Sequence, residues 1–548
     1  MMNIRTRVSI SAVVALSFSG TGAPQSAPPP LLGGLGSFSR TITTSSAEAQ
    51  RYFNQGLALM YAFNHDEAIR AFKRAAELDP KCAMAFWGIA IANGPHINNT
   101  VVPPERAKEA WDAALRARTL GANATSAERG LIEALAFRYA NPQPENRMPL
   151  EQAYASAMRG VWKEFRKDGD VGALFAESLA DLRPWDLWTA DGKPQPGTEE
   201  LVATIESALV IAPKHPLANH LMIHAVEASA HPEKADRAAD TLRDLQPGLG
   251  HLVHMPSHID VRRGRWQESI VANAKAIESD RKYTARSREQ GFYRLYMAHN
   301  HHMLTYSAMM TGQSALALRT IREMVGDMPV EFFKTNLWAD GLMAMPLEVL
   351  MRFGKWDEIL AEPAFPEFVP MSQTLQHYAR AVAYSAQGDG PSASREQAAF
   401  MEARTKVTKE ATLGNNPGAD ILDLAESFMR GEILFRAGKI EEGLASLREA
   451  SSREDRLRYD EPPDWIQPVR HALGAALLSA GRYADAEAVF RENLKMLPEN
   501  GWGLYGLGRA LRLQKKDAEA AAIEKRFGAI WKKADMKINS ACLCLPGV

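Results

Sequence analysis

The stretch from Ala49 to Pro80, which reads AQRYFNQGLALMYAFNHDEAIRAFKRAAELDP, decides the fold of this chain. Small residues stand at Gly56, Ala68 and Ala75, and they allow two helix backbones to approach each other closely. Pro80 stands where the second helix must end, because proline donates no backbone hydrogen bond and clashes with the preceding turn. The stretch therefore predicts two antiparallel helices that are joined by a short turn.

The same arrangement of small residues and proline returns at other places in the chain. Gly508 repeats the place of Gly474 one period later, and Gly250 opens a unit one period after the unit that Pro216 opens. A fixed period of about 34 residues indicates a repeat architecture. Further members of the same register near the C-terminal end are Gly481, Ala486, Phe490, Pro498 and Ala520.

These units resemble the tetratricopeptide repeat, in which two helices fill one period and successive repeats stack into a solenoid. The resemblance covers most of residues 47–530 and implies an all-α fold, a right-handed α-solenoid of helix-turn-helix repeats. Because matching units stand at both ends, we expect one continuous solenoid over 47–530, with histidine-rich repeats at about 216–330. Residues 531–548 are expected to form a C-terminal tail.

The composition argues against two classes of protein. The 64 basic and 65 acidic residues nearly cancel, and no long run of one sign occurs in the chain. A nucleic-acid-binding protein needs a basic face, so we expect no nucleic acid as a partner. No segment beyond the N-terminus offers the ~20 uninterrupted apolar residues of a membrane span, so the chain is not expected to span a membrane.

The N-terminal segment 1–27 reads as an export signal. Arg5 and Arg7 precede an apolar, small-residue stretch from Val8 to Gly20, and small residues around 23–27 offer a cleavage site. We therefore predict a signal peptide over 1–27, followed by a flexible leader over 28–46, and a periplasmic or secreted protein. The competing interpretation is a disordered N-terminus.

The three cysteines cannot staple a fold of this size. Cys82 falls in a predicted helix and is expected to be a small core residue. Cys542 and Cys544 stand in the tail with one residue between them, which is not the spacing of a structural zinc site. Three interpretations remain for this pair: a redox pair, a metal handle, or two thiols without a role.

Histidine is concentrated in the middle of the chain, where ten of the 14 histidines lie between His215 and His302. In the repeat register most of them stand on first helices at places three or four residues apart, and such places share one helix face. First helices line the concave groove of the solenoid. We therefore expect seven imidazoles to face one stretch of the groove: His220, His224, His251, His254, His258, His299 and His302.

These residue types predict a metal site in the groove. Two histidines four residues apart can bind one ion from one helix, and imidazole is the commonest metal ligand in proteins. Glu348, one repeat beyond His302, is expected to close the far side of the site as a carboxylate ligand. Ligands of this kind without thiolate suit a divalent transition metal such as zinc, copper or iron. Three helices span ~20 Å, so two ions, or one ion and a catalytic histidine, are both consistent with the pattern.

Two residues of the same face are assigned catalytic roles. Glu227 follows His224 by three residues and is a candidate ligand, base or orienting partner of an imidazole. Tyr306 takes the corresponding place four residues after His302. A bound metal with an open position would activate water or oxygen, so hydrolytic or oxidative chemistry on a small-molecule substrate follows as the leading hypothesis.

Competing hypotheses use the same groove without chemistry. Repeats of this type commonly hold a peptide or a partner protein, and the imidazoles would then be neutral and hydrated. A metal carrier or sensor without turnover is a further alternative.

Other residues near the cluster have different expected roles. His215 and His231 stand beside prolines in turns, where we expect them at the surface, and His301 is expected in the core. His96 either reaches a ligand or caps its helix. The aromatic break from Arg183 to Trp188 is a candidate lid over the histidines.

Three histidine segments resemble a family of bacterial tetratricopeptide-repeat proteins that are often exported. The segments are Asn219-His220-x3-His224-x2-Glu227, His254-Met-Pro-Ser-His258-Ile and His299-Asn-x-His302. The resemblance supports the site and implies no particular reaction. Pro256 is expected to bend the helix between His254 and His258, because it removes a backbone hydrogen bond, and so to re-aim the two imidazoles.

Overall fold

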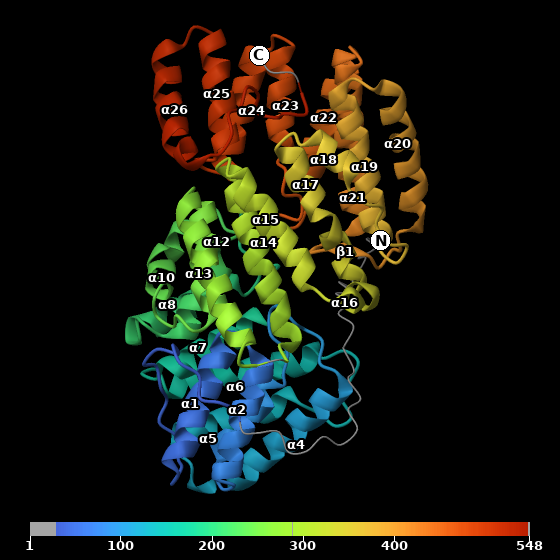
Figure 1. The fold of residues 1–548 in the computed structure, drawn as a ribbon. Coiled ribbons are helices and arrows are strands. Elements are labelled where there is room, and N and C mark those ends of the chain that lie inside the picture. Colours follow the sequence, from blue (N-terminus) through green and yellow to red (C-terminus); the bar gives the residue numbers. More distant parts are fainter. Residues whose placement is uncertain (1–28, 288, 546–548) are drawn as a thin grey trace, which may run out of the picture.

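The computed structural model describes residues 29–287 and 289–545 of the chain (Figure 1). The predicted signal peptide over 1–27 lies outside the described residues and stays a prediction. Nearly all described elements are helices, and consecutive helices pack against one another in antiparallel pairs. The predicted all-α solenoid of helix hairpins is confirmed.

The first half of the chain reaches the histidine-rich centre. Its helices, including 3-10 helices labelled η, are α1 Ala47–Tyr61, α2 His65–Leu78, α3 Ala83–Ala92, α4 Pro104–Leu120, η1 Gly121–Asn123, α5 Ser126–Leu135, η2 Ala136–Arg138, α6 Met148–Glu164, α7 Gly169–Ala180, α8 Thr198–Ile211, α9 Pro216–Val226, η3 Pro232–Ala235, α10 Asp236–Leu242, α11 Gly250–His254, α12 Pro256–Arg262 and α13 Trp266–Thr284.

The second half continues the stack and contains a short hairpin of two strands. Its elements are η4 Gly291–Tyr293, α14 Arg294–Met310, α15 Ser314–Asp327, α16 Val330–Thr335, η5 Leu337–Ala344, α17 Met345–Arg352, α18 Trp356–Ala361, α19 Pro370–Gln387, α20 Gly390–Ala403, η6 Arg404–Lys406, β1 Thr412–Leu413, β2 Asn416–Pro417, α21 Gly418–Arg436, α22 Ile440–Glu454, α23 Val469–Ser479, α24 Tyr483–Met496, α25 Gly501–Leu513, α26 Asp517–Ile530 and η7 Trp531–Lys533.

One aromatic side chain in each of two hairpins explains why glycine is needed in the repeat. A Cβ at Gly56 would stand 2.6 Å from the ring of Phe72, and a Cβ at Gly88 would stand 2.4 Å from the same ring. Near the C-terminal end, a Cβ at Gly474 would stand 2.3 Å from Phe490. The buried phenyl ring therefore fills the space that the missing side chain leaves, which ties the sequence register to the packing of the helices.

The two halves have separate apolar cores that meet around α12 to α14. The first half curls back on itself, so that α1 contacts α9 and α2 contacts η4. The second half closes in the same way, because Trp266 Nε1 in α13 donates to Pro498 O and Trp502 Nε1 in α25 donates to Met309 O. Concave faces of the solenoid are therefore enclosed by other parts of the chain.

Residues 29–46 precede α1 and contact the body of the first half. Arg40 donates to both carboxylate oxygens of Asp168 at 3.0 Å, and it also pairs with Asp170 at 3.0 Å. Gly34 O accepts from Gly248 N at 2.8 Å. The segment expected as a flexible leader is thus held by polar contacts in the described residues, and the predicted boundaries of leader and tail stay predictions.

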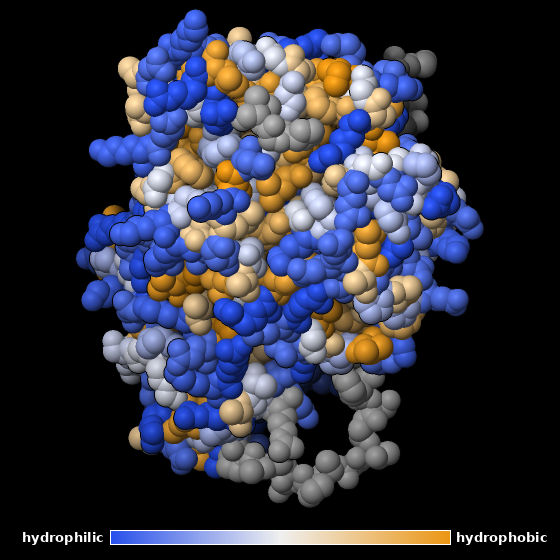
Figure 2. All heavy atoms as spheres, turned by 45° about the horizontal axis from the view of Figure 1, so that its top comes forward, coloured by the Kyte–Doolittle hydropathy of each residue, from blue (hydrophilic) through white to orange (hydrophobic). Residues whose placement is uncertain are grey.

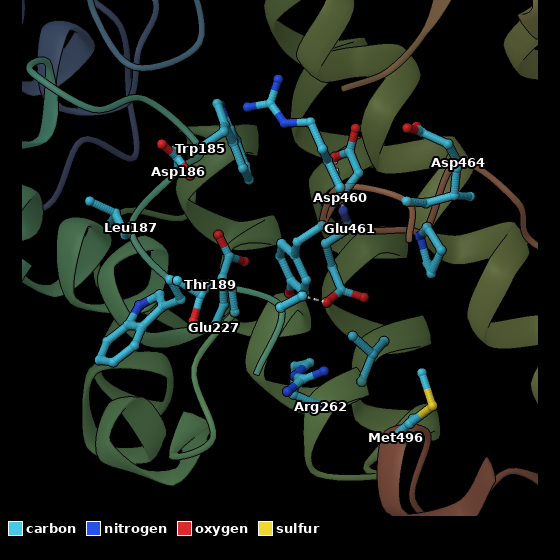
Figure 3. A pocket seen from close by; sticks show the side chains of 18 of the residues that line it. Trp185, Asp186, Leu187, Thr189, Glu227, Arg262, Asp460, Glu461, Asp464 and Met496 are labelled. Carbon is cyan, nitrogen blue, oxygen red and sulfur yellow. Dashed lines mark hydrogen bonds between the residues drawn. The ribbon is translucent and has the colours of Figure 1, made fainter. Parts of the chain in front are cut away.

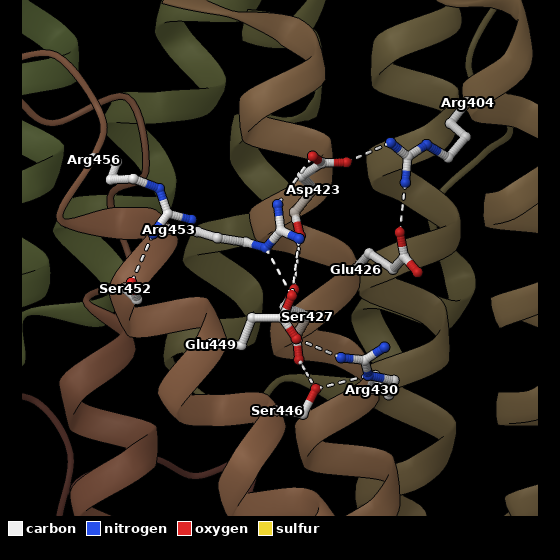
Figure 4. A network of polar contacts seen from close by, with 10 residues as sticks. All are labelled: Arg404, Asp423, Glu426, Ser427, Arg430, Ser446, Glu449, Ser452, Arg453 and Arg456. Carbon is white, nitrogen blue, oxygen red and sulfur yellow. Dashed lines mark hydrogen bonds and ion pairs between the residues drawn. The ribbon is translucent and has the colours of Figure 1, made fainter.

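Charged side chains tie neighbouring helices together on the outside of the second half (Figure 4). Arg404 of η6 pairs with Asp423 and Glu426 of α21, and Arg453 of α22 reaches Asp423 at 3.0 Å and Glu449 at 2.9 Å. Because these groups are partly exposed, each pair adds at most ~1 kcal/mol to the free energy of unfolding. The network connects three consecutive elements and so reinforces their register.

The surface is mainly hydrophilic with smaller apolar areas between the charged side chains, as one face in Figure 2 shows. Among the helices that the structure describes, none is both long enough and apolar enough to cross a membrane.

Candidate metal centre

Four short stretches of helix bring the central histidines together. α9 carries His220 and His224, and α11 carries His251 and His254. The helix is divided at Met255 and Pro256, as predicted, and α12 then carries His258. The fourth stretch is α14, which carries His299. The imidazoles from these elements form two neighbouring groups of three.

The first triad consists of His220, His224 and His251. All three side chains are buried, and one ring nitrogen from each lies within 4.8 Å of the other two. The Nε2 atoms of His251 and His220 are 3.2 Å apart. Three nitrogens this close suit the coordination sphere of one transition-metal ion.

The second triad consists of His254, His258 and His299, whose ligand nitrogens also lie within 4.8 Å of one another. The Nε2 atoms of His254 and His258 are 2.8 Å apart, and the Nε2 atoms of His299 and His258 are 3.3 Å apart. The break at Pro256 turns the last two rings of the α11–α12 segment toward each other, because the interplanar angle between His254 and His258 is 81°.

Glu227 joins the two triads. It follows the last residue of α9 and is buried, and its Oε1 accepts from His224 Nδ1 at 2.8 Å. Its Oε2 accepts from His258 Nδ1 at 2.6 Å. Burial opposes the charge, but His258 and His224 lower the pKa of Glu227 to about 2. One carboxylate therefore orients one imidazole of each triad, as acceptors beside metal-bound histidines do. With both oxygens engaged, Glu227 fits this orienting role better than that of a free base.

Two further acceptors orient the neighbouring rings. His220 Nδ1 donates to the backbone oxygen of Tyr61 at 2.9 Å, and His254 Nδ1 donates to Asn273 Oδ1 at 2.6 Å. The amide of Asn273 is itself fixed, because its Nδ2 donates to the backbone oxygen of Ser269. These acceptors, together with Glu227, place the proton of four imidazoles on Nδ1 and leave Nε2 with its lone pair.

The contact between His254 and His258 shows that the donor set fits a cation. Since both rings carry their proton on Nδ1, the two Nε2 atoms present lone pairs to each other at 2.8 Å. That arrangement is repulsive unless a cation lies between the nitrogens. Two nitrogens that bind one tetrahedral ion at ~2.1 Å stand about 3.4 Å apart, which is near the observed spacings.

Burial keeps most of the cluster in the form that binds metal. Desolvation, reinforced by neighbouring imidazoles, holds the pKa values of His220, His251, His254 and His299 well below the ordinary value. His258 is different, because desolvation lowers its pKa but the nearby charge of Glu227 outweighs this and raises it. Neutral imidazole is the ligand form, so protons compete weakly at most of these positions.

Aromatic residues of the first repeat cover the histidine cluster. The ring of Phe63 lies 4.4 Å from that of His220 and 5.6 Å from that of His251, measured between centroids. His96 and His65 stack on each other at 4.2 Å beside the same phenyl ring. The sequence pointed to none of these contacts, because the first repeat stands far before the cluster in the chain and only the curl of the solenoid joins them.

A buried hydrogen-bond chain supports α11 from the opposite side. His251 N donates to the hydroxyl of Tyr293, which donates to Asp280 Oδ1 at 3.1 Å. Asn300 Nδ2 donates to the other oxygen of Asp280 at 2.7 Å. Burial raises the pKa of Asp280 to about 7. This chain fixes the start of α11, and hence the position of its two ligands.

Three predicted site residues stand apart from the triads. His302 is buried with its Nε2 unpartnered, and Tyr306 has an unpartnered hydroxyl. Glu348 lies in the second core, where its carboxylate neighbours Ile466 N and Tyr378. Neither His302 nor Glu348 joins a group of ligand atoms among the described residues. The elements α16 and η5 precede α17 and shift Glu348 away from the histidines.

The remaining histidines show where local reasoning succeeds and fails. His215 was expected at the surface but is buried, where it accepts from Ala218 N and bonds with Asp170, so that prediction is wrong. His231 is exposed as expected. His301 is buried and donates to Met297 O, so its assignment to the core is confirmed.

A cavity of about 860 Å³ adjoins the first triad and Glu227 (Figure 3). One wall is the segment between α7 and α8, where the ring of Trp185 meets that of His224 at 5.4 Å and Trp188 Nε1 donates to Ala225 O. This segment covers the histidines, as the prediction of a lid requires. The opposite wall comes from the loop between α22 and α23, which follows much later in the chain.

The far wall of the cavity carries groups that hold protons. Glu461 accepts a hydrogen bond from the hydroxyl of Tyr459, and burial raises the pKa of Glu461 to about 7. The β1–β2 hairpin supports this wall, because Asn416 Nδ2 donates to Asp464 Oδ2 at 2.6 Å. Tyr306 also lines the cavity. The site therefore combines imidazole ligands with proton-bearing side chains on the facing wall.

Sequence comparison agrees with the repeat register. The profile of the tetratricopeptide repeat matches residues 49–82 and again residues 471–532. The chain carries tetratricopeptide repeats. Curated proteins show no match to it in sequence.

Solved structures give distant likenesses only. The human IFIT1 dimer with m7Gppp-AAAA is 12% identical over 89% of this chain and 91% of that chain, with a TM-score of 0.32. The same dimer with PPP-AAAA gives a TM-score of 0.33 at the same identity and coverage. The Cut9–Hcn1 hetero-tetramer of the APC/C is 13% identical over 89% of this chain and 76% of that chain, with a TM-score of 0.29.

Proposed function

We propose that this protein is an exported metalloprotein whose two histidine triads hold a pair of transition-metal ions beside a cavity of substrate size. The observation that carries the proposal is the pairing of the triads by Glu227, which orients one imidazole of each. Export is inferred from the N-terminal sequence and from the resemblance of the histidine segments to a bacterial exported family.

The donor set narrows the metal. Each triad offers three buried imidazoles and no thiolate, which suits zinc, copper or iron and disfavours magnesium and calcium. Three protein ligands leave at least one coordination position for water or substrate. The first triad meets the cavity at His224, so this position would be reached from there.

The chemistry that fits best is hydrolysis or oxidation of a small molecule. A metal at this site would supply an activated water or oxygen molecule. Glu227 would keep two ligands in place, while Tyr306 and Glu461 would exchange protons with a substrate in the cavity, which they line together. The aromatic segment around Trp185 would exclude water from the first triad.

A peptide-binding adaptor is the competing function for a protein with tetratricopeptide repeats. Adaptors of this kind need a concave face that is open to a partner. Here the histidine-bearing face is covered by α1 and Phe63, which favours the metal site at this location. The cavity in Figure 3 remains the place where a peptide side chain would enter.

Elemental analysis tests the proposal directly. The chain is purified without a histidine tag, and its metal content is measured beside that of a His254→Ala/His258→Ala variant. We expect close to two equivalents of metal in the native chain and at least one fewer in the variant. Saturating metal should also raise Tm, because a ligand at 100 times its Kd stabilises the folded state by ~2.7 kcal/mol.

A native chain without stoichiometric metal, whose Tm does not respond to added zinc, copper or iron, would contradict the metal site. Turnover is tested separately, by assaying the loaded protein against panels of esters, peptides and phenols with oxygen. Export is tested by fractionating cells that express the full chain, where a purely cytoplasmic product would contradict it.

A further inference from the structure

The C-terminal tail lies inside the second half and carries a cluster that the histidine site does not use. Cys542 and Cys544 are both buried, and the structure joins them in a disulfide. The Cys542 sulfur lies 3.8 Å from Glu432 Oε1 of α21. One ligand atom from each of these three residues lies within 4.8 Å of the other two.

Glu432 has no evident structural reason to be where it is. Its side chain is buried, and its Oε2 has no hydrogen-bond partner among the described residues. Burying a carboxylate without donors or a cation is costly, so such groups are normally paired or bound to a metal. The unsatisfied oxygen therefore points to a missing ligand beside the two sulfurs.

The tail is held in position by contacts that do not involve the sulfur atoms. Arg352 Nη2 donates to Ala541 O at 2.9 Å, and Arg436 Nε donates to Cys544 O at 2.6 Å. The guanidinium of Arg352 also lies over the ring of Trp502 at 3.6 Å. These backbone contacts persist when the disulfide opens, so the two thiols would stay beside Glu432.

We propose that Cys542, Cys544 and Glu432 form, in the dithiol state, a second metal site of thiolate–carboxylate type that takes a divalent ion of the zinc class. Two thiolates and one carboxylate are zinc ligands, and a water molecule completes a tetrahedral sphere. The carboxylate disfavours Cu(I), which prefers sulfur ligands alone. Arg436 offsets the negative charge that remains after the ion binds.

The disulfide is the closed form of this site. A dithiol reductant supplies two electrons and two protons, which break the S–S bond and give two thiols, while the reductant becomes a disulfide. Binding of the divalent ion then releases the two thiol protons, and two metal–sulfur bonds form. The metal affinity of the tail is thus controlled by the redox state of its surroundings.

Cobalt separates this site from the histidine triads, because only thiolate ligands give the intense near-ultraviolet sulfur-to-cobalt charge-transfer absorption. The full chain is reduced with excess phosphine, freed of reductant without air, and titrated with Co²⁺. Free thiols are counted in denaturant and the fold is monitored by circular dichroism. We expect three thiols, an intact helical spectrum, and a charge-transfer band that saturates at one equivalent.

Variants supply the controls. The band should be absent from the oxidised chain and from Cys542→Ser/Cys544→Ser, and it should persist in Cys82→Ser, which removes the other buried cysteine. Glu432→Gln should keep the band but weaken Co²⁺ affinity at least about tenfold, the scale on which partners of metal ligands act. Because imidazole gives no such band, empty triads would leave these results unchanged.

Two outcomes would overturn the proposal. In one, the folded chain keeps its disulfide under excess phosphine, so that only one thiol is counted. In the other, the reduced and folded chain shows three thiols but no charge-transfer band. Either result would make the pair a covalent staple of the tail.

Discussion

Glu227 shows how much of the site depends on a single carboxylate. It accepts one hydrogen bond from His224 and one from His258, and these two imidazoles belong to different triads and different helices. A glutamine has the same shape but offers one acceptor oxygen, so one of the two Nδ1–H groups would face an NH₂ group. The ring concerned would then turn, and its Nε2 would leave the ligand position.

We therefore expect Glu227→Gln to lower metal affinity by about 10–100-fold, as loss of such partners does elsewhere. Affinity is measured by competition with a chromophoric chelator. Glu348→Gln is the matched control, because Glu348 is also a buried carboxyl on a first helix but joins neither triad. Equal affinities of Glu227→Gln and the native chain would show that the bridge is not functional.

Gly250 is a second residue on which the site depends. A Cβ at this position would stand 2.0 Å from Asp280 Oδ1, in the hydrogen-bond chain that supports α11. Gly250→Ala should therefore lower the free energy of unfolding by ~1–3 kcal/mol, the usual cost of overpacking. Urea unfolding measures the change. Gly326→Ala, where nothing lies within 4 Å of the new Cβ, should leave stability nearly unchanged.

At the scale of the element, the break between α11 and α12 places the second triad. α11 ends at His254 and α12 begins at Pro256, and this turns the rings of His254 and His258 toward each other. A straight helix would stack them on one face at i, i+4 without this rotation. The proline is thus the element-scale cause of the short Nε2–Nε2 contact.

Pro256→Ala would let the two helices join, because alanine restores a backbone donor and favours helix. We expect unchanged or higher helix content by circular dichroism, and affinity for the second metal equivalent about tenfold lower, as for other changes in ligand orientation. Pro216→Ala is the control, since Pro216 lies at the start of α9, where no donor is needed. Unchanged binding of both equivalents in Pro256→Ala would contradict this role.

At the scale of the whole molecule, the first half is closed by contacts between residues far apart in sequence. Asp170 in α7 accepts from Arg40 of the N-terminal segment, from the hydroxyl of Tyr61, and from His215 Nε2. Burial opposes the charge, but His215, Arg40 and Tyr61 together lower the pKa of Asp170 from 3.8 to about 2. This carboxylate holds three segments around the end of α1, next to the histidines.

The pKa shift predicts how stability depends on pH. A carboxyl group with a depressed pKa in the folded state stabilises fully above its unfolded value and loses this contribution as pH falls toward its folded value. Asp170→Asn should therefore lower the free energy of unfolding by about 2 kcal/mol at pH 7. The difference from the native chain should shrink between pH 4 and pH 2.

Urea unfolding at pH 7 and near pH 3 measures this dependence. Asp112→Asn is the control, because Asp112 forms an exposed pair with Lys108, and such pairs contribute ~0–1 kcal/mol. A deficit in Asp170→Asn that stays constant over the acid range would assign the effect to packing and not to charge.

The sequence by itself determined the helices, the period of the repeat and the identity of six metal-ligand candidates. Register residues such as Gly56 and Pro80 are local signals, because helix ends and close helix contacts depend on neighbours a few residues away. Spacings of three and four residues likewise predict which histidines share a helix face. Even the bend at Pro256 follows from the chemistry of one residue.

Only the tertiary structure decided how the histidines divide into two triads, what orients them, and what covers them. His302 and Glu348 share the predicted spacing but not the site, and His215 is buried against expectation. Phe63, Asn273 and the loop that carries Glu461 reach the cluster through the curl of the solenoid. That curl is the sum of many small angles between packed helices, and no local spacing in the sequence encodes such a sum.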